Sequence, residues 1–313
     1  MGFGRTEGRT VSTENASKKV AFLGLGHMGG PMAANLVKAG YEVLAFDPVP
    51  AAQDQARADG ATVVDTAVWA AAEADIVLTM LPNGRIVLDV YGDILAAAKP
   101  GTLFIDCSTI DVADAQAAAE LAAAAGHRAV DAPVSGGVAG ATAGTLTFMV
   151  GGADADFADA LPLLEVMGGK VVHCGAAGVG QAAKICNNMI LGISMIGLSE
   201  AIVLGEKLGL THDKFFDVVS TASGQSWALT SYCPVPGPVP TSPANNDYKP
   251  GFATALMTKD LGLAANALRG NGVDGQIGIL AAEIYSRYNQ DEAGKDFSAI
   301  VTDIRKRSGE DQA

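Results

Sequence analysis

The sequence predicts an α/β Rossmann-type N-terminal domain with a parallel-rich sheet, joined by a long helix to an all-α C-terminal domain. Short apolar segments of strand length alternate with helical segments between residues 19 and 178. Such alternation is typical of a parallel sheet that is covered by helices on both faces. Strand signals then cease, and residues 179–313 carry only helical patterns and one proline-rich segment. We therefore expect domains over 19–178 and 179–313.

Composition limits the class of protein. The chain has 313 residues, of which 49% are hydrophobic, and a net charge of −13. This length allows two domains with sizeable cores, and the acidic balance argues against nucleic acid and anionic membranes as partners. The four cysteines form no C-x-x-C pair and the four histidines are scattered. We expect free thiols in a reducing compartment, and neither a disulfide framework nor a metal site.

The first 18 residues are polar and glycine-rich, without an apolar core of signal-peptide length. Glu7 and Glu14 disfavour a mitochondrial transit peptide, whereas Arg5 and Arg9 leave that alternative open. We interpret residues 1–18 as a disordered leader or an expression remnant, and we leave them out of the predicted fold.

A glycine-rich segment follows the first predicted strand, Val20–Leu23, and opens a helical pattern over Pro31–Ala39. Its glycines permit a tight turn, close approach of a pyrophosphate, and packing of helix on strand. The next predicted strand, Glu42–Phe46, ends at Asp47, where a carboxylate is placed to bind ribose hydroxyls and to repel a 2′-phosphate. The sequence therefore predicts NAD rather than NADP, bound at Asp47 and at Gly24, Leu25, Gly26, His27, Met28 and Gly29.

Three further strands are predicted at Ile76–Met80, Leu103–Asp106 and Arg128–Ala132. Because parallel strands end at one edge of a sheet, the loops that leave the first two should line the cofactor cleft. This assigns Leu81, Pro82 and Thr109 to the cofactor.

The segment that leaves the third of these strands combines a serine hydroxyl with two consecutive glycines. Hydroxyl and backbone N–H groups in this arrangement suit a small carboxylate, and an ordinary polar turn is the alternative. The segment is Asp131-Ala132-Pro133-Val134-Ser135-Gly136-Gly137.

A long helix is predicted over Gly178–Leu208, which contains no proline and is apolar on nearly every face. Polar residues recur along it and basic clusters do not flank it, so a buried core helix is favoured over a membrane span. Lys184 and Asn188 are four residues apart and share a face. Burial of a lysine costs free energy, so a buried Lys184 would indicate a functional role. The alternative is that Lys184 reaches solvent from the helix end.

Helices are also predicted at Thr211–Ser220, Met257–Arg269 and Ile277–Tyr288. The proline-rich segment between the first two, Tyr232–Pro240, cannot be regular structure. Its neighbouring aromatic residues favour a packed excursion over a disordered linker.

Three sequence motifs together resemble the β-hydroxyacid dehydrogenase family: GLGHMGGPMAANL (24–36), DAPVSGGVAGATAGTL (131–146) and GVGQAAKICNN (178–188). The resemblance covers residues 19–304 and extends to the runs SGQSW (223–227) and GFATALMTKDLGLA (251–264). It implies that Lys184 is the catalytic lysine, that Ser135, Gly136 and Gly137 hold the substrate carboxylate, and that Asn188 fixes the lysine or the substrate. It also implies that Lys259 reaches the cofactor and the substrate. Ile86 stands where relatives often carry an asparagine near the nicotinamide ribose.

The resemblance implies NAD-dependent oxidation of 3-hydroxyisobutyrate to methylmalonate semialdehyde, a step of valine catabolism, without a metal. Trp227 and Phe252 are candidates for the apolar wall that meets the substrate methyl, and their alternative is a core role. Rival interpretations are a reductase of tartronate, succinic or glyoxylic semialdehyde, and an inactive NAD-binding scaffold, against which the presence of Lys184 argues. We expect a homodimer or homotetramer in the cytoplasm, with the mitochondrial matrix left open.

Overall fold

The computed structural model describes residues 18–309, so the leader interpretation lies almost wholly outside the described residues. The chain divides into two compact units, and the division falls between Lys184 and Ile185. This division falls inside the long helix α8 (Val179–Lys207), whereas the predicted boundary lies just before it. We call residues up to 184 the first unit and the residues after them the second unit.

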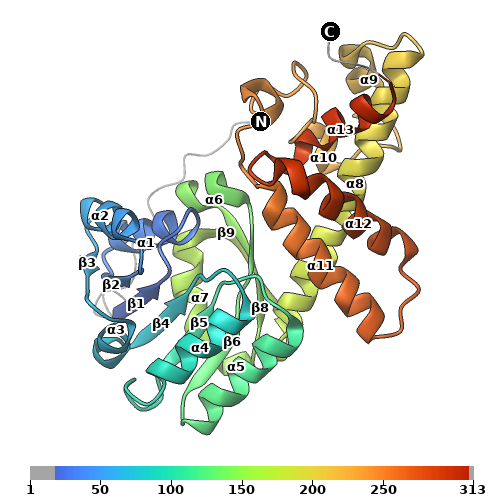
Figure 1. Cartoon of the computed structure of the whole chain (residues 1–313). Coiled ribbons are helices and arrows are strands. Elements are labelled where there is room, and N and C mark those ends of the chain that lie inside the picture. The colour runs from blue at the N-terminus through green and yellow to red at the C-terminus, as the bar shows by residue number, and fades with distance from the viewer. Residues whose placement is uncertain (1–17, 310–313) are drawn as a thin grey trace. The chain divides into compact units, whose positions relative to one another are not determined.

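The first unit is built on a nine-stranded sheet of order β3-β2-β1-β4-β5-β6-β8-β7, with β9 beside β8 (Figure 1). Pairs from β3 through β6 are parallel, whereas β8 runs antiparallel to β6 and β7. The prediction of a parallel-rich sheet is confirmed; at its far end only the pairs of β8 with β6 and β7 are antiparallel, and β9 is parallel to β8. The strands are β1 (Lys19–Leu23), β2 (Glu42–Phe46), β3 (Thr62–Val63), β4 (Ile76–Thr79), β5 (Leu103–Asp106), β6 (Arg128–Asp131), β7 (Val134–Ser135), β8 (Leu146–Gly151) and β9 (Gly168–Gly175).

Central strands read as continuous apolar runs because helices cover both of their faces. In β1, Phe22 packs into one core with α1 and α7, while Ala21 packs into a second core with α3, α4 and α5. The helices of this unit are α1 (Gly29–Lys38), α2 (Pro50–Ala58), α3 (Ala67–Glu73), α4 (Gly84–Ile94), α5 (Val112–Ala124), α6 (Gly137–Ala143) and α7 (Asp154–Met167).

Several short helices were not predicted from the sequence. Helix α2 begins with Pro50, whose fixed φ suits a first helical position. Helices α3 and α4 begin after Thr66 and Asn83, whose side chains accept hydrogen bonds from Trp69 N and Ile86 N. Helices α2 and α3 have only 9 and 7 residues, so their apolar patterns are short.

Helix α8 is one continuous helix of 29 residues, close to the predicted Gly178–Leu208. Its length and composition alone would allow a membrane span, but half of its apolar window is buried within the protein. Such burial is expected of a core helix.

The second unit contains only helices and irregular segments among its described residues. Helices α11 and α12 lie side by side (Figure 1) and share a core with α8 that includes Met195, Leu261 and Tyr285. Besides α8, the elements are α9 (His212–Val219), α10 (Trp227–Thr230), η1 (Pro243–Asn246), α11 (Thr254–Gly270), α12 (Gln276–Glu292), η2 (Phe297–Ala299) and α13 (Ile300–Arg307).

The proline-rich segment is packed, so the linker alternative is wrong. Cys233 and Val235 are buried. Ser242 Oγ donates to the Cys233 carbonyl at 2.6 Å, and Tyr248 OH donates to the Pro234 carbonyl at 2.9 Å. Side chains here supply the hydrogen bonds that proline cannot make through its own backbone.

Candidate active site

The glycine loop leaves β1 and enters α1 as the sequence predicts. Gly24 has a φ of +94°, and a Cβ there would lie 2.3 Å from the Met80 carbonyl oxygen. A Cβ on Gly29 would lie 2.0 Å from the Gly24 carbonyl oxygen. Both positions therefore require glycine. Gly26 is exposed and a Cβ there would meet no atom within 4 Å, so its backbone is open to a ligand.

Asp47 follows β2 directly and is buried. Its Oδ2 accepts a hydrogen bond from Leu25 N at 2.7 Å, and its Oδ1 accepts one from Val49 N at 2.8 Å. The carboxylate thus ties the end of β2 to the glycine loop. Each oxygen retains a second lone pair, so these residues fit a ribose diol together with a pyrophosphate.

The loops that leave β4 and β5 are joined through Asp106 and Ser108. Asp106 Oδ1 accepts from Thr79 Oγ1 at 2.8 Å and from Ser108 Oγ at 2.6 Å. The Ser108 hydroxyl in turn accepts from Leu81 N at 2.8 Å. This network holds the segment 81–82 beside the segment 108–109, as expected for two loops on one edge of the sheet.

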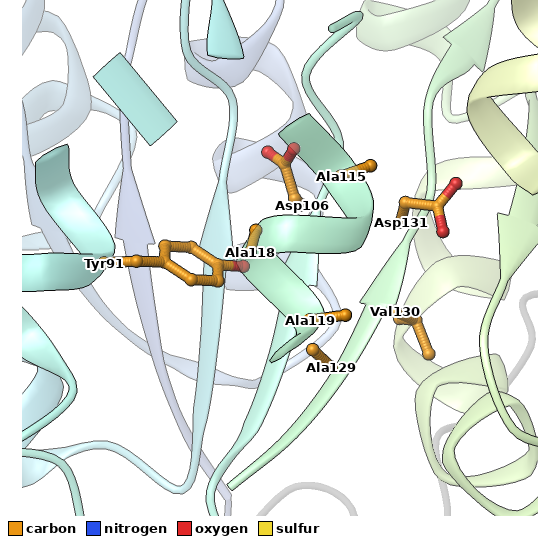
Figure 2. A pocket seen from close by; sticks show the side chains of 8 residues that line it. All are labelled: Tyr91, Asp106, Ala115, Ala118, Ala119, Ala129, Val130 and Asp131. Carbon is orange, nitrogen blue, oxygen red and sulfur yellow. The ribbon is translucent and has the colours of Figure 1, made fainter. Parts of the chain in front are cut away.

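A small cavity lies beside this network, under α5. Figure 2 shows Asp106 and Asp131, from the ends of β5 and β6, with Tyr91 of α4 and alanine side chains of α5. The cavity has room for about one water molecule. It is therefore too small for a hydroxy acid.

Asp131 holds the beginning of α8. Its Oδ1 accepts from Gly178 N at 2.6 Å, and its Oδ2 accepts from Gln181 N at 2.9 Å. Gly178 directly precedes α8 and Gln181 lies in its first turn, so neither N–H group has a partner within the helix. A Cβ on Gly151 or Gly180 would lie 2.4 or 2.6 Å from an Asp131 oxygen, so both glycines are needed for this approach.

Gln181 ties the same turn of α8 to the loop after β5. It is fully buried, its Nε2 donates to the Ser108 carbonyl at 2.7 Å, and its Oε1 accepts from Ile110 N at 3.1 Å. Lys184 comes one turn later on α8 and is only 6% exposed. Lys184 is therefore buried rather than exposed at the helix end.

Ser135 ends β7, four residues after Asp131, and is partly exposed. Gly136 and Gly137 follow with φ angles of +136° and +60°. Such angles are strained for other residues, so the turn into α6 requires this pair. The segment that carries Ser135 is fixed to α8 through Asp131.

In the second unit, the structure brings together Asn188 and Lys259 through Asp260, which the sequence analysis did not single out. Asn188 Nδ2 donates to Asp260 Oδ2 at 2.5 Å, while Asn188 Oδ1 accepts from Asn187 Nδ2 at 2.9 Å. Lys259 Nζ lies 3.5 Å from Asp260 Oδ1. The only signal in the sequence was an acid directly after Lys259.

Trp227 and Phe252 belong to one aromatic cluster of the second unit. Trp227 stacks on Tyr232, with ring centroids 5.1 Å apart, and Phe252 meets the face of Phe297 edge-on at 5.7 Å. Trp227 is 53% exposed, so it is not a core residue.

The predicted residues are distributed over both units. The first unit holds the glycine loop, Asp47, Leu81, Pro82, Thr109, the Ser135–Gly137 turn and Lys184, and the second holds Asn188, Trp227, Phe252 and Lys259. Within residues 18–309, no group of three or more His, Cys, Asp and Glu side chains is placed to hold a metal ion.

Comparison with known proteins accounts for nearly the whole chain. Residues 19–175 match a family model described as the NAD binding domain of 6-phosphogluconate dehydrogenase. Residues 178–304 match a model described as the NAD-binding domain of NADP-dependent 3-hydroxyisobutyrate dehydrogenase.

Individual relatives agree with these family models. A probable 3-hydroxyisobutyrate dehydrogenase of Mycobacterium tuberculosis is 56% identical over 289 residues, which cover 92% of this chain and 98% of the relative. An NAD-dependent L-serine dehydrogenase of Pseudomonas aeruginosa is 45% identical over 287 residues, covering 90% and 96%. The solved structure of M. tuberculosis 3-hydroxyisobutyrate dehydrogenase with L-serine has a TM-score of 0.89 and covers 92% of this chain and 99% of that chain.

The Asp131 carboxyl gives the protein a pH-dependent stability. Burial raises its pKa from 3.8 to about 6, against the opposing effect of the N–H groups of Gly178 and Gln181. A pKa that is higher in the folded state favours folding of the protonated form. The contribution of Asp131 is complete below about pH 4 and is lost as the pH rises through about 6.

We therefore expect the stability of the wild type, relative to Asp131→Asn, to decrease between pH 4.5 and pH 7 by about 2 kcal/mol. Urea unfolding of both proteins at the two pH values measures this difference. A difference that is the same at both would show that the pKa of Asp131 is not raised.

Proposed function

The chain belongs to the 3-hydroxyisobutyrate dehydrogenase family of NAD-dependent hydroxyacid dehydrogenases, and we propose that its substrate is 3-hydroxyisobutyrate. The reaction would break the C–H bond of the carbinol carbon and the O–H bond of the hydroxyl, giving methylmalonate semialdehyde, as in valine catabolism. NAD, when bound, accepts the hydride. The rest of the proposal concerns what residues of this chain do.

Lys184 is proposed to exchange the proton of the reacting hydroxyl. As a neutral amine, Lys184 would accept that proton during oxidation. As an ammonium, it would return the proton during reduction. Its burial, one turn after the anchored Gln181, is the observation that supports this role most strongly. A low-dielectric environment strengthens its electrostatic effect on the substrate oxygen.

Substrate orientation is assigned to polar groups on separate segments. The Ser135 hydroxyl and the N–H groups of Gly136 and Gly137 would hold the carboxylate. Asn188 would hydrogen-bond to the lysine or the substrate, with its amide orientation fixed by Asp260. Trp227 and Phe252 would contact the methyl group.

A kinetic screen tests the substrate. We expect kcat/KM to decrease from 3-hydroxyisobutyrate to 3-hydroxypropionate by roughly 10–200-fold, because one methyl contact is lost. Glycerate and L-serine should follow, since a hydroxyl or an ammonium against an apolar wall lacks a partner. Glycerate in first place would instead indicate a tartronate semialdehyde reductase.

L-serine in first place would indicate a serine dehydrogenase, a second candidate that two observations favour. One is the 45% identity to an L-serine dehydrogenase. The other is the buried carboxylate of Asp260 beside Asn188, which has the charge to pair with an ammonium. The same screen, run with both dinucleotides, tests the preference for NAD over NADP that Asp47 supports.

Lys184→Ala tests the mechanism. We expect kcat to fall by on the order of 10²–10⁴-fold, because the variant lacks the proton-exchanging group. The Kd for NAD, measured by calorimetry, should change little. Lys170→Ala, at an exposed lysine of the same unit, is the control and should keep wild-type kcat. A Lys184→Ala enzyme with more than about a tenth of wild-type kcat would exclude this lysine from the chemistry.

We propose that the protein forms a homodimer or homotetramer. We also propose a cytoplasmic location. Ile190 and Leu204 of α8 are 62% and 59% exposed, and Leu208, directly after the helix, is 77% exposed. Association with a second chain would remove these large apolar side chains from water. We expect sedimentation velocity to give a mass of two or four chains of 31.7 kDa. A single 31.7 kDa species at micromolar concentration would contradict this.

A further inference from the structure

A buried carboxylate of the second unit takes no part in the reaction proposed above. Asp296 lies just before η2 and has no exposed surface. Its Oδ2 accepts from Tyr232 OH at 2.8 Å, from Gly251 N at 3.0 Å and from Phe252 N at 3.1 Å. Its Oδ1 accepts from Ser298 N at 3.0 Å and from Ser298 Oγ at 2.6 Å.

These five donors are neutral N–H and O–H groups from three separate segments of the chain. Hydrogen bonds to an ionised carboxylate are roughly twice as strong as those between neutral groups. One side chain thereby fixes the end of α10, the approach to α11 and the turn of η2 relative to one another.

The backbone around Asp296 also completes the N-terminus of α11. Thr254 N donates to the Lys295 carbonyl at 2.8 Å, and Ala255 N donates to the Ala293 carbonyl at 3.1 Å. Phe297 N donates to the Phe252 carbonyl at 3.0 Å. The start of the helix that carries Lys259 and Asp260 is therefore held by the segment that Asp296 organises.

The aromatic cluster rests on the same carboxylate. Tyr232, whose hydroxyl is bound to Asp296, lies between two rings: Trp227 at 5.1 Å and Phe297 at 5.3 Å, both stacked. Phe252, whose N–H also binds Asp296, contacts Phe297 edge-on. Substitution of Asp296 would remove hydrogen bonds that hold Tyr232 and Phe252. It would affect Trp227 and Phe297 only through their ring contacts.

We propose that Asp296 is a positioning residue for substrate selection, which fixes Tyr232 and Phe252 and, through Tyr232, the exposed ring of Trp227. The selectivity part of this inference rests on the proposed function, in which Trp227 and Phe252 meet the substrate methyl. Loss of the anchor should weaken discrimination between side groups more than it slows chemistry, because Asp296 contacts no reacting group.

Two variants test this with steady-state kinetics. Asp296→Asn replaces an accepting oxygen by a donor, and Tyr232→Phe removes one donor while keeping the ring. In both, the ratio of kcat/KM for 3-hydroxyisobutyrate over 3-hydroxypropionate should fall from roughly 10–200 toward 1. The change should lie mainly in KM for the acid, with KM for NAD within about twofold of the wild type. If Asp296→Asn does not fold, the ratio measured for Tyr232→Phe alone tests the proposal.

Glu206→Gln is the matched control. Glu206 is a carboxylate of the second unit that is only partly buried, and it binds Arg305 and His212. This variant should lose stability while the substrate ratio stays at its wild-type value. An unchanged ratio in Asp296→Asn and Tyr232→Phe, or an equal change in Glu206→Gln, would overturn the proposal.

Tryptophan fluorescence gives a readout that does not depend on activity. The sequence has two tryptophans, so Trp69→Phe leaves Trp227 as the single reporter. In this background, Tyr232→Phe and Asp296→Asn should lower the Trp227 anisotropy and raise its acrylamide quenching constant by at least about twofold as stacking is lost; Glu206→Gln should change neither.

The two readouts separate failure of the inference from failure of the proposed function. If Trp227 responds but the wild type oxidises neither acid, the positioning role stands and the proposed substrate fails. If the wild type prefers 3-hydroxyisobutyrate and Trp227 does not respond, the positioning role is wrong and the proposed function stands.

Discussion

The two hydrogen bonds that Gly178 N and Gln181 N, at the beginning of α8, donate to the Asp131 carboxylate are the interaction on which the first unit of this enzyme depends. They place the positive end of a 29-residue helix against a negative charge at the end of β6. A hydrogen bond to a charged group contributes about 1.5–3 kcal/mol, whereas burial opposes ionisation and raises the pKa of Asp131 to about 6. The anchor therefore depends on close contact, and close contact depends on Gly151 and Gly180.

Much of the fold could be predicted because its central strands are buried on both faces. β2 and β5 have the predicted limits, since each is an apolar run with a polar residue or glycine beside it. The short helices α2 and α3 were missed because they depend on caps and on contacts with the sheet more than on a long amphipathic pattern. Helix α4, with 11 residues, was missed although it is as long as helices that were predicted. The antiparallel pairing of β8 with β6 and β7 was missed because strand direction carries no local signal.

Some residues of the candidate site could also be proposed from the sequence, whereas others could not. Gly24 could be proposed from the spacing of its motif, whereas the role of Ser135 was proposed from the family resemblance, because its residues alone also fit a polar turn. Asp131 and Asp260 could not be assigned roles, because their partners lie 47–72 residues away in the chain. A sequence pattern can show that an acid is present, but whether it accepts hydrogen bonds from a helix N-terminus or from an asparagine is decided by tertiary packing.

Asp131 in the first unit and Asp296 in the second unit make the same kind of hydrogen-bonded contact. Each is a buried carboxylate that accepts from a glycine N–H: Gly178 in one case and Gly251 in the other. A Cβ on Gly251 would lie 2.6 Å from Tyr232 Oη, so this close packing also requires glycine. A carboxylate suits such a position because both of its oxygens only accept, whereas an amide of the same shape presents one donor that would face another N–H. One aspartate can therefore hold several segments that share no regular structure. For this reason, a residue that positions a site can tolerate fewer substitutions than a residue that lines the site.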